Sequence, residues 1–587
     1  YRKLVYEYWN EDPHMLWNAA PKPSMHDSMN AYSNGIQSFI RRAPVLLIIY
    51  GLLIALTVLT FQSVPRGFIP TQDKQYLFAG VQLPEGASLE RTQRAMEQMS
   101  EIVLATPGTT NAVSFPGLNA VHFVNTPNIG TMFIGLEPDH DREASALELA
   151  NQLSFAFGEI NDGLAFAFMP PPVFGYGNAA GFEMYIQDRA GQDYGELNTQ
   201  VQNIMGAFME TEGFGPGAVF SSYQANVPQY DALVDRVRAK QQGLQLTDVF
   251  STLEVYLGGA YVNDLNLFGR TYGVYAQADA EFRDEITDIG ELMTRNRDGD
   301  MVPLASVIDI VESFGPDPAI RYNGFPAADL QGAPFTPDIS AEQSLEIASG
   351  ITDQVLPRGM DFEWTGLTFQ QVSQGSAVLY VMVLCVLLAF LVLAAFYENW
   401  TLPLAIILIV PLCMLSALGG IWLLNMVRGL IFGIQIASGA ILPPPMSVPP
   451  TFIDINVFTQ IGLVVLMGLA CKNAILIVEF ARDLERHGRG IFDAAVEACR
   501  LRLRPILMTS FAFIAGVTPL VFASGAGAEV RHVMGVTVFG GMLGVTFFGL
   551  VLTPVFYVVL RKFESRLRGT NEQDEKIDSS GMGEAHA

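Results

Sequence analysis

The sequence predicts an α-helical membrane domain of six transmembrane helices joined to a large α+β domain outside the membrane. The 587 residues are 50% hydrophobic and 16% charged, too apolar for a purely soluble protein and too polar for a membrane domain alone. Six apolar runs are long enough to cross a bilayer. Between the first run and the second lies a long polar region, which contains an internal repeat of strand and helix patterns.

The spans follow from the apolar runs, and their orientation follows from the flanking charges. The predicted spans are 43–64, 375–397, 402–426, 457–480, 505–525 and 534–560. Basic residues flank them at Arg41 and Arg42, in the arginine-rich stretch Arg482 to Arg504, and after residue 560, so this side faces the cytoplasm by the positive-inside rule. Segment 1–42, with a surface helix from Ser28, and the polar tail 562–587 are therefore predicted to be cytoplasmic.

The polar region between the first two spans is predicted to hold two related units and an insertion. Residues 65–172 show strands and helices in the order βαββαβ, the ferredoxin-like arrangement. The same order repeats in 173–225 and resumes in 323–370, where Ser340 and Gln343 form a capping box. The inserted segment, 226–322, is predicted to contain a helix and a hairpin at Gly258 to Tyr275.

Charge and cysteine content exclude several functions. The net charge is −25, and the stretch Arg66 to Glu363 holds 41 acidic and 15 basic residues. A face this acidic gives no electrostatic basis for binding nucleic acid. The four cysteines lie in or beside apolar runs, so no disulfide framework or zinc site is indicated. The sequence has no P-loop, so ATP is not expected to drive this chain, and no HExxH, GxSxG or CxxC motif argues for an enzyme.

Lys472 is the strongest candidate for chemistry, because it lies deep inside an apolar span. It precedes Arg482 by ten residues, which is about 15 Å along a helix and roughly the middle of the hydrocarbon core. A charge at that depth costs at least ~2.5–3.5 kcal/mol, so we expect Lys472 to face protein and to have a partner. With Asn473 it predicts an ion-coupling site, whereas a snorkelling or neutral lysine is the simpler alternative.

Arg502 and Thr509 are the second candidates in the membrane domain. They are seven residues apart and therefore share one face of a helix. The alternatives are that Arg502 is an ordinary flanking charge and that Thr509 bonds only to its own helix backbone. In the polar region, most of the phenylalanines are expected to form core, and Met169 and Met184 are expected to fill gaps rather than bind metal.

Several stretches together resemble the resistance–nodulation–division (RND) efflux permeases, in the hydrophobe/amphiphile branch. They are GLACKNAILIVEFARDL, RLRPILMTSFAFIAGVTPLV, GFIPTQDKQYLFAGVQLPEGAS, GGAYVNDLNLFGR, RYNGFPA and AFYENWTLPLAI. The resemblance covers about residues 30–565 and the carboxy-terminal half of the family only. It implies a bacterial inner-membrane protein with a periplasmic porter domain made from 65–172 and from 173–225 with 323–370. The segment 226–322 then resembles the docking subdomain.

The resemblance also implies a mechanism and partners. The family exports hydrophobic and amphiphilic small molecules by drug/proton antiport, using the proton gradient and no cofactor. Its relay pairs two aspartates of the amino-terminal half with a lysine, an arginine and a threonine, which are Lys472, Arg502 and Thr509 here. The aspartate-bearing half is missing from this chain. Other implied partners are two further copies in a trimer, a periplasmic adaptor protein and an outer-membrane channel.

Drug-contacting positions carry over from the resemblance less directly. Tyr76, Phe78, Thr131 and Phe133 correspond to a deep pocket, and Phe166 and Phe168 to an entry pocket. The loop Pro116 to Pro127 occupies the position of a switch loop, with Phe123 as its candidate contact, but departs from the family's Gly/Phe pattern. Segment 428–456 is longer and richer in proline than the family's short loop, and we expect an apolar periplasmic insert. A metal-exporting RND protein and a non-transporting sensor or assembly protein remain as alternatives.

Overall fold

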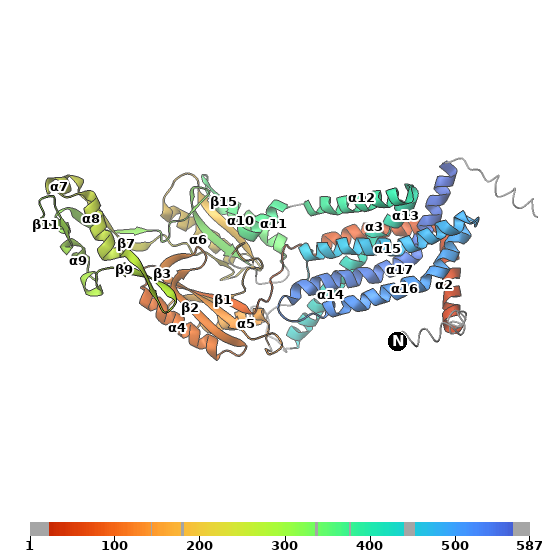
Figure 1. The fold of residues 1–587 in the computed structure, drawn as a ribbon, viewed down its shortest axis with the longest axis horizontal. Helices are drawn as coiled ribbons and strands as arrows, with labels where there is room; N and C mark the ends of the chain where they lie inside the picture. Colours follow the sequence, from red (N-terminus) through yellow and green to blue (C-terminus); the bar gives the residue numbers. More distant parts are fainter. Residues whose placement is uncertain are drawn as a thin grey trace, which may run out of the picture.

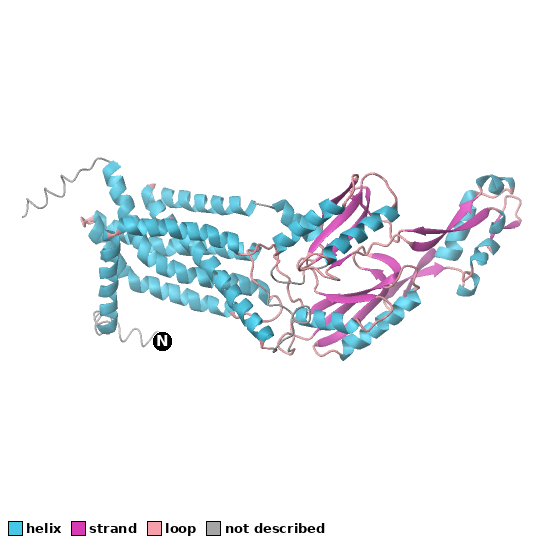
Figure 2. Cartoon of the chain, turned by 180° about the vertical axis from the view of Figure 1, so that it is seen from behind, coloured by secondary structure: helices cyan, strands magenta, loops and turns pink. Residues whose placement is uncertain are grey.

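The computed structural model describes residues 23–567 except 143, 178–180, 216, 335–338, 375–376 and 439–451. Residues 1–22 of the predicted cytoplasmic segment 1–42 and most of the tail 562–587 therefore lie outside the described residues. The molecule is elongated, with long helices at one end and the strands at the other (Figure 1 and Figure 2). This separation matches the predicted division into a membrane domain and a mixed α/β domain.

The membrane domain contains six helical spans within the described chain, each long and apolar enough to cross a bilayer. Its helices are α2 (Pro23–Arg41), α3 (Ala43–Ser63), α12 (Ala377–Tyr397), α13 (Thr401–Ile407), α14 (Val410–Ala437), α15 (Val457–Arg486), α16 (Ile491–Val521) and α17 (Ala528–Leu567). Helix α17 packs against α14, α15 and α16. Helix α2 lies across the ends of the others (Figure 1).

Several helices are longer than the apolar runs that predicted them. Helix α16 begins at Ile491 instead of residue 505, and α15 continues to Arg486. The arginine-rich stretch is thus mostly helical, because Arg, Glu and Ala are good helix formers that hydropathy alone does not score.

The predicted insert at 428–456 also needs correction. Helix α14 continues through Ala437, so the first ten residues of this segment are helical. Residues 439–451 lie outside the described part of the chain, and Phe452 to Asn456 form an extended lead-in to α15. Asn425 of α14 holds this lead-in through two hydrogen bonds to the backbone of Ile453, at 2.7 and 2.9 Å.

The two units of the α/β domain share one strand order. The first unit comprises β1 (Tyr76–Gln82), α4 (Leu89–Ala105), β2 (Thr109–Asn119), β3 (Val124–Leu136), α5 (Ala146–Phe157) and β4 (Leu164–Phe168). The second comprises β5 (Phe182–Asp188), α6 (Tyr194–Met209), β6 (Val219–Phe220), β14 (Phe325–Gly332), α10 (Ala341–Val355) and β15 (Met360–Trp364). The first sheet runs β2-β3-β1-β4, and the second runs β6-β14-β5-β15 with β13 (Arg321–Tyr322) at its edge.

Each sheet buries one face under its own two helices. In the first unit, Leu77, Ala79 and Val81 alternate along β1 and pack against α4 and α5. In the second unit, Phe182, Met184 and Ile186 do the same along β5. The capping box predicted at the start of α10 is present, with Ser340 accepting from the Gln343 amide.

The insertion between β6 and β13 forms a separate small unit at the far end of the molecule (Figure 1). Its elements are β7 (Val227–Val234), α7 (Arg236–Gln241), α8 (Leu246–Leu253), β8 (Ala260–Leu267), β9 (Arg270–Ala276), α9 (Ile286–Glu291), β10 (Met293–Arg295), β11 (Met301–Pro303) and β12 (Ile308–Gly315). Strands β8 and β9 form the predicted hairpin, whose turn residues Phe268 and Gly269 both have positive φ, as a tight hairpin turn requires.

A buried ionic junction joins the first α/β unit to the membrane domain. The Arg142 side chain, which follows β3, pairs with the Asp73 carboxylate ahead of β1. The Asp73 amide donates to a Glu529 carboxylate oxygen at the start of α17, at 3.3 Å, and the Gly527 amide donates to the Asp73 carbonyl at 3.0 Å. The first sheet is thereby attached to the helix at the centre of the bundle.

Candidate functional site

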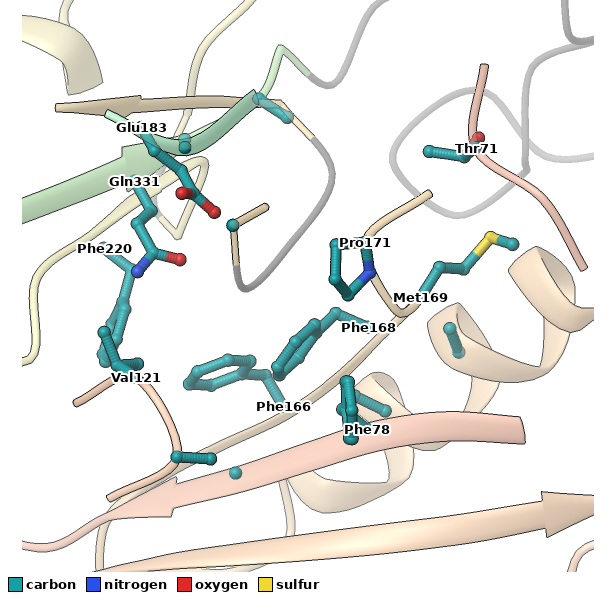
Figure 3. Close-up of a pocket in the computed structure, with 18 of the residues that line it drawn as sticks. Thr71, Phe78, Val121, Phe166, Phe168, Met169, Pro171, Glu183, Phe220 and Gln331 are labelled. Atoms are coloured by element: carbon teal, nitrogen blue, oxygen red, sulfur yellow. The ribbon is translucent and has the colours of Figure 1, made fainter. Parts of the chain in front are cut away.

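A cavity of about 1350 Å³ lies between the two sheets of the α/β domain. One wall comes from β1, β3 and β4 of the first unit, and the opposite wall from β5, β6 and β14 of the second. Phe78, Phe166 and Phe168 line the first wall, and Glu183 and Gln331 extend from the second (Figure 3). The cavity is therefore aromatic on one side and polar on the other.

Strand alternation explains why the first wall is aromatic. Because successive side chains point to opposite faces, Phe78 lies opposite the Leu77 and Ala79 core face. The register pairs Phe78 with Phe133 on β3 and with Phe168 on β4. Phe166 pairs with Gly80 on β1. These phenylalanines thus face the cavity and not the core under α4 and α5.

The rings of this wall contact one another. Ring centroids lie 4.9 Å apart for Phe78 and Phe133, 5.8 Å for Phe78 and Phe168, and 5.6 Å for Phe166 and Phe168. Phe220 of β6 reaches across from the second unit to Phe166, at 5.1 Å. Such an aromatic surface binds flat apolar groups through burial and ring packing, without requiring a fixed hydrogen-bond pattern.

The second wall is polar for the same geometric reason. On β5 the side chains of Glu183 and Tyr185 lie on the face opposite the Phe182 and Met184 core face. Across the strand pair, Glu183 is opposite Gln331 and Tyr185 is opposite Asp329. Burial raises the pKa of Tyr185 to about 12, so its hydroxyl stays protonated and can donate a hydrogen bond.

Six of the seven predicted substrate contacts line the cavity: Phe78, Phe123, Thr131, Phe133, Phe166 and Phe168. Tyr76 does not; it lies two residues before Phe78 on β1, and the two ring centroids are 5.6 Å apart in an edge-type contact. Thr131 is nearly buried, and its hydroxyl donates to the Leu118 carbonyl at 2.8 Å, so it shapes the wall more than it offers a free polar group.

The predicted loop at Pro116 to Pro127 is mostly strand. Strand β2 continues to Asn119 and β3 begins at Val124, which leaves a four-residue tip, 120–123. The register shifts between Pro116 and Leu118, so the hairpin carries an irregularity there and bends. Asn119, Val121 and Phe123 of this hairpin end line the cavity.

Sequence reasoning missed the polar wall and Phe220. Glu183, Tyr185 and Gln187 alternate with core residues in FEMYIQD, and this pattern signals a polar second face. No local signal indicates that Phe220 meets Phe166, because that contact depends on how the two units pack. Met184, weighed as a metal ligand, lies in the core of the second unit, and Met169 lies at the edge of the first core.

The predicted relay residues lie on α15 and α16 and have different environments. The Lys472 side chain is exposed on the surface of this chain, and no ion pair or hydrogen bond holds it among the described residues. Its neighbour Asn473 is buried and donates to the Ser510 hydroxyl of α16 at 3.2 Å. The two residues therefore point to different sides of α15.

Arg502 and Thr509 make local contacts on this chain. The Arg502 guanidinium lies 4.4 Å from the centroid of the Phe480 ring, a cation–π contact between α16 and α15. The Thr509 hydroxyl donates to the Ile506 carbonyl of its own helix at 3.1 Å, the simpler alternative weighed for it. Within the described residues, neither side chain bonds to Lys472.

Comparison with known proteins identifies the family. The sequence model of the AcrB/AcrD/AcrF family matches residues 10–442 and 446–561. The toluene efflux pump membrane transporter TtgB of Pseudomonas putida is 35% identical over 553 residues, covering 94% of this chain and 49% of TtgB. The multidrug export protein AcrF of Escherichia coli is 32% identical over 546 residues, covering 91% of this chain and 49% of AcrF.

The chain spans about half the length of the curated relatives it matches; for the multidrug resistance protein MdtF of Escherichia coli, at 31% identity, the covered share is 50%. The match runs through both α/β units, the insertion and all six spans. Taken with these identities and the six apolar spans, it shows that this chain is a membrane protein of the AcrB/AcrD/AcrF family of RND multidrug efflux permeases.

Proposed function

We propose that this chain is the carboxy-terminal half of a proton-driven efflux transporter for hydrophobic and amphiphilic compounds. The observation that carries the proposal is the cavity between the two sheets. Its volume of about 1350 Å³ exceeds the ~300–1,000 Å³ typical of sites for drug-sized ligands. Its aromatic wall suits varied apolar groups, and its polar wall suits the polar end of an amphiphile.

The proton-coupling part of the proposal rests on Lys472. A lysine near mid-membrane that is exposed on this chain requires a partner from elsewhere to remain charged. An aspartate pair on an amino-terminal half would supply it. Proton uptake by those carboxylates would weaken their pairing with Lys472, and the helix bundle would then rearrange.

The remaining features of the proposal concern fold and assembly. The shared order β2-β3-β1-β4 and β6-β14-β5-β15 supports two ferredoxin-like repeats that act as porter subdomains in the periplasm. The insertion with its exposed β8–β9 hairpin would be the docking subdomain. We place the protein in the bacterial inner membrane, as a trimer with a periplasmic adaptor and an outer-membrane channel.

Ligand binding to the cavity tests the proposal directly. In the purified full chain, Phe166→Ala combined with Phe168→Ala should weaken binding of rhodamine 6G, measured by fluorescence polarisation, about tenfold. Two lost ring contacts at ~0.5–1.5 kcal/mol each account for that factor. Phe155→Ala is the matched control, because Phe155 of the same unit is 83% exposed and lies outside the cavity lining. Unchanged binding by a folded double variant would contradict the cavity as the ligand site.

A further inference from the structure

The tip of the β2–β3 hairpin is attached to the second unit by three side chains. The Nε2 atom of His122, in the tip, lies 3.2 Å from Oδ1 of Asp329 on β14 and 3.0 Å from Oγ of Ser222 after β6. Oγ of Ser222 donates to the same Asp329 oxygen at 2.9 Å, and the Ser222 amide donates to the other carboxylate oxygen at 3.0 Å. Since Ser222 gives its proton to Asp329, Nε2 of His122 acts as the donor in its own contacts.

This cluster is largely buried, with Ser222 at the cavity wall. The side chains of His122 and Asp329 are only 8% and 4% exposed. The Tyr185 ring lies 6.4 Å from the His122 ring, and Tyr322 stacks behind Tyr185 at 4.6 Å. A buried imidazole and carboxylate are stable there only while they remain paired, so the cluster resists separation of the two units at this point.

The geometry does not fit a nucleophilic relay. In a catalytic triad the carboxylate and the hydroxyl occupy different nitrogens of the imidazole. Here Asp329 and Ser222 share the same nitrogen, and they bond to each other directly. The arrangement instead joins a hairpin to a sheet, and it holds the hairpin tip in place.

The hairpin tip needs such an attachment. Phe123, next to His122, has a φ of 55° and is 72% exposed, so neither backbone preference nor packing of its own ring holds it in place. The tip residues Ala120, Val121 and Phe123 line the cavity at the same time. Two amides of the tip bond within the hairpin, and the contact of His122 ties this part of the wall to the opposite sheet.

We propose that His122, Ser222 and Asp329 form a clasp that sets the width of the cavity at its hairpin end, and that His122 thereby limits the size of ligand accepted. The proposal rests on the proposed function, because it assumes that the cavity binds ligands. Releasing the clasp frees the tip to move away from the second sheet. A small ligand then loses part of its enclosure, whereas a bulky ligand gains room.

The test compares His122→Ala, Ser222→Ala and the double variant with the unchanged full chain. The two probes are N-phenyl-1-naphthylamine, which is small, and rhodamine 6G, which is bulky. We expect each single variant to weaken binding of the small probe severalfold and to leave that of the bulky probe equal or stronger. The double variant should show no further shift, since both residues act through one clasp. His122→Gln, which retains a donor, should preserve most of the size preference.

Hydrogen–deuterium exchange of the hairpin tip supplies a readout that needs no ligand. The amides of 119–124 should exchange faster in His122→Ala and Ser222→Ala, while the core strand β1 stays protected. His140→Ala is the matched control, because His140 belongs to the same unit and its side chain is 80% exposed. Unchanged exchange at the tip, or equal shifts in affinity for both probes, would overturn the clasp. If the unchanged chain binds neither probe while exchange responds as expected, the cavity function fails and the size limit fails with it, but the attachment of the tip stands.

Discussion

At the scale of single residues, Lys472 and Asn473 show how neighbours on one helix serve different purposes. Asn473 is buried against α16 and donates to Ser510, so it belongs to the packing of this chain. Lys472 is exposed on the surface of this chain, and its position in the sequence predicts mid-membrane depth, where the surroundings are lipid or another protein chain. A charge in that position has no role in holding this chain together, which is why we assign it to coupling.

Lys472→Ala should abolish proton-driven export by the complete pump and leave the amount of membrane-inserted protein unchanged. The lost group is the cationic side of the relay, and no packing of this chain depends on it. Drug export by inverted vesicles under an imposed pH gradient provides the measurement. Asn473→Ala is the informative comparison: it removes a buried hydrogen bond worth about 1 kcal/mol and should lower thermal stability. Near-normal export by the lysine variant would refute the relay assignment.

At the scale of elements, the junction between the first sheet and α17 attaches the α/β domain to the membrane domain. Arg142, Asp73 and Glu529 come from the segment after β3, the segment before β1 and the first turn of α17. Burial lowers the pKa of the Arg142 side chain, while the Glu529 carboxylate acts in the opposite direction. Because α17 packs against α15, which carries Lys472, this junction connects the helices around Lys472 to the first sheet.

Arg142→Ala should destabilise the protein by about 3–5 kcal/mol, because it leaves the buried Asp73 carboxylate without its cation. The expected observation is a large fall in the melting temperature of the purified chain. Arg91→Ala is the control: its ion pair with Asp162, at 2.9 Å, is exposed on both sides, and such pairs contribute at most ~1 kcal/mol. Equal melting temperatures for the two variants would show that the junction is not a stabilising element.

At the scale of the whole molecule, several membrane helices have apolar faces that the rest of the described chain does not cover. Helices α3 and α16 each contain a long apolar stretch, and few residues of these two stretches are buried by the described chain. Lys472 opens onto the surface of the same bundle. A second set of helices, packed against these faces, would account for both observations. Such a second set also agrees with the chain spanning about half of its relatives' length.

The chain expressed alone should therefore not transport, whereas co-expression with an amino-terminal half that carries an intramembrane aspartate pair should restore proton-dependent export. The physical reason is that Lys472 has no carboxylate partner among the described residues of this chain. Dye accumulation in cells that lack other efflux pumps measures the difference. Proton-dependent export by the chain alone would refute both the half-transporter proposal and the role of Lys472.

The sequence by itself determined the division into membrane and α/β domains, the six spans and the repeat of βαββαβ order, while the depth of Lys472 stays a prediction. These features depend on local properties, namely apolar run length, alternation along a strand and capping residues such as Ser340. The ends of the helices were predicted less well from the sequence, because polar helix formers extend α15 and α16 beyond their apolar runs.

For β1, where both faces are apolar, only the tertiary structure decided which face lines the cavity and which meets the core. Phe78 and Leu77 are equally apolar in sequence, yet one lines the cavity and the other packs under the helices. The contact of His122 with Asp329 joins residues 207 positions apart, and that of Phe166 with Phe220 crosses between units. Such contacts arise from the packing of two separately folded sheets against each other, which no local pattern encodes.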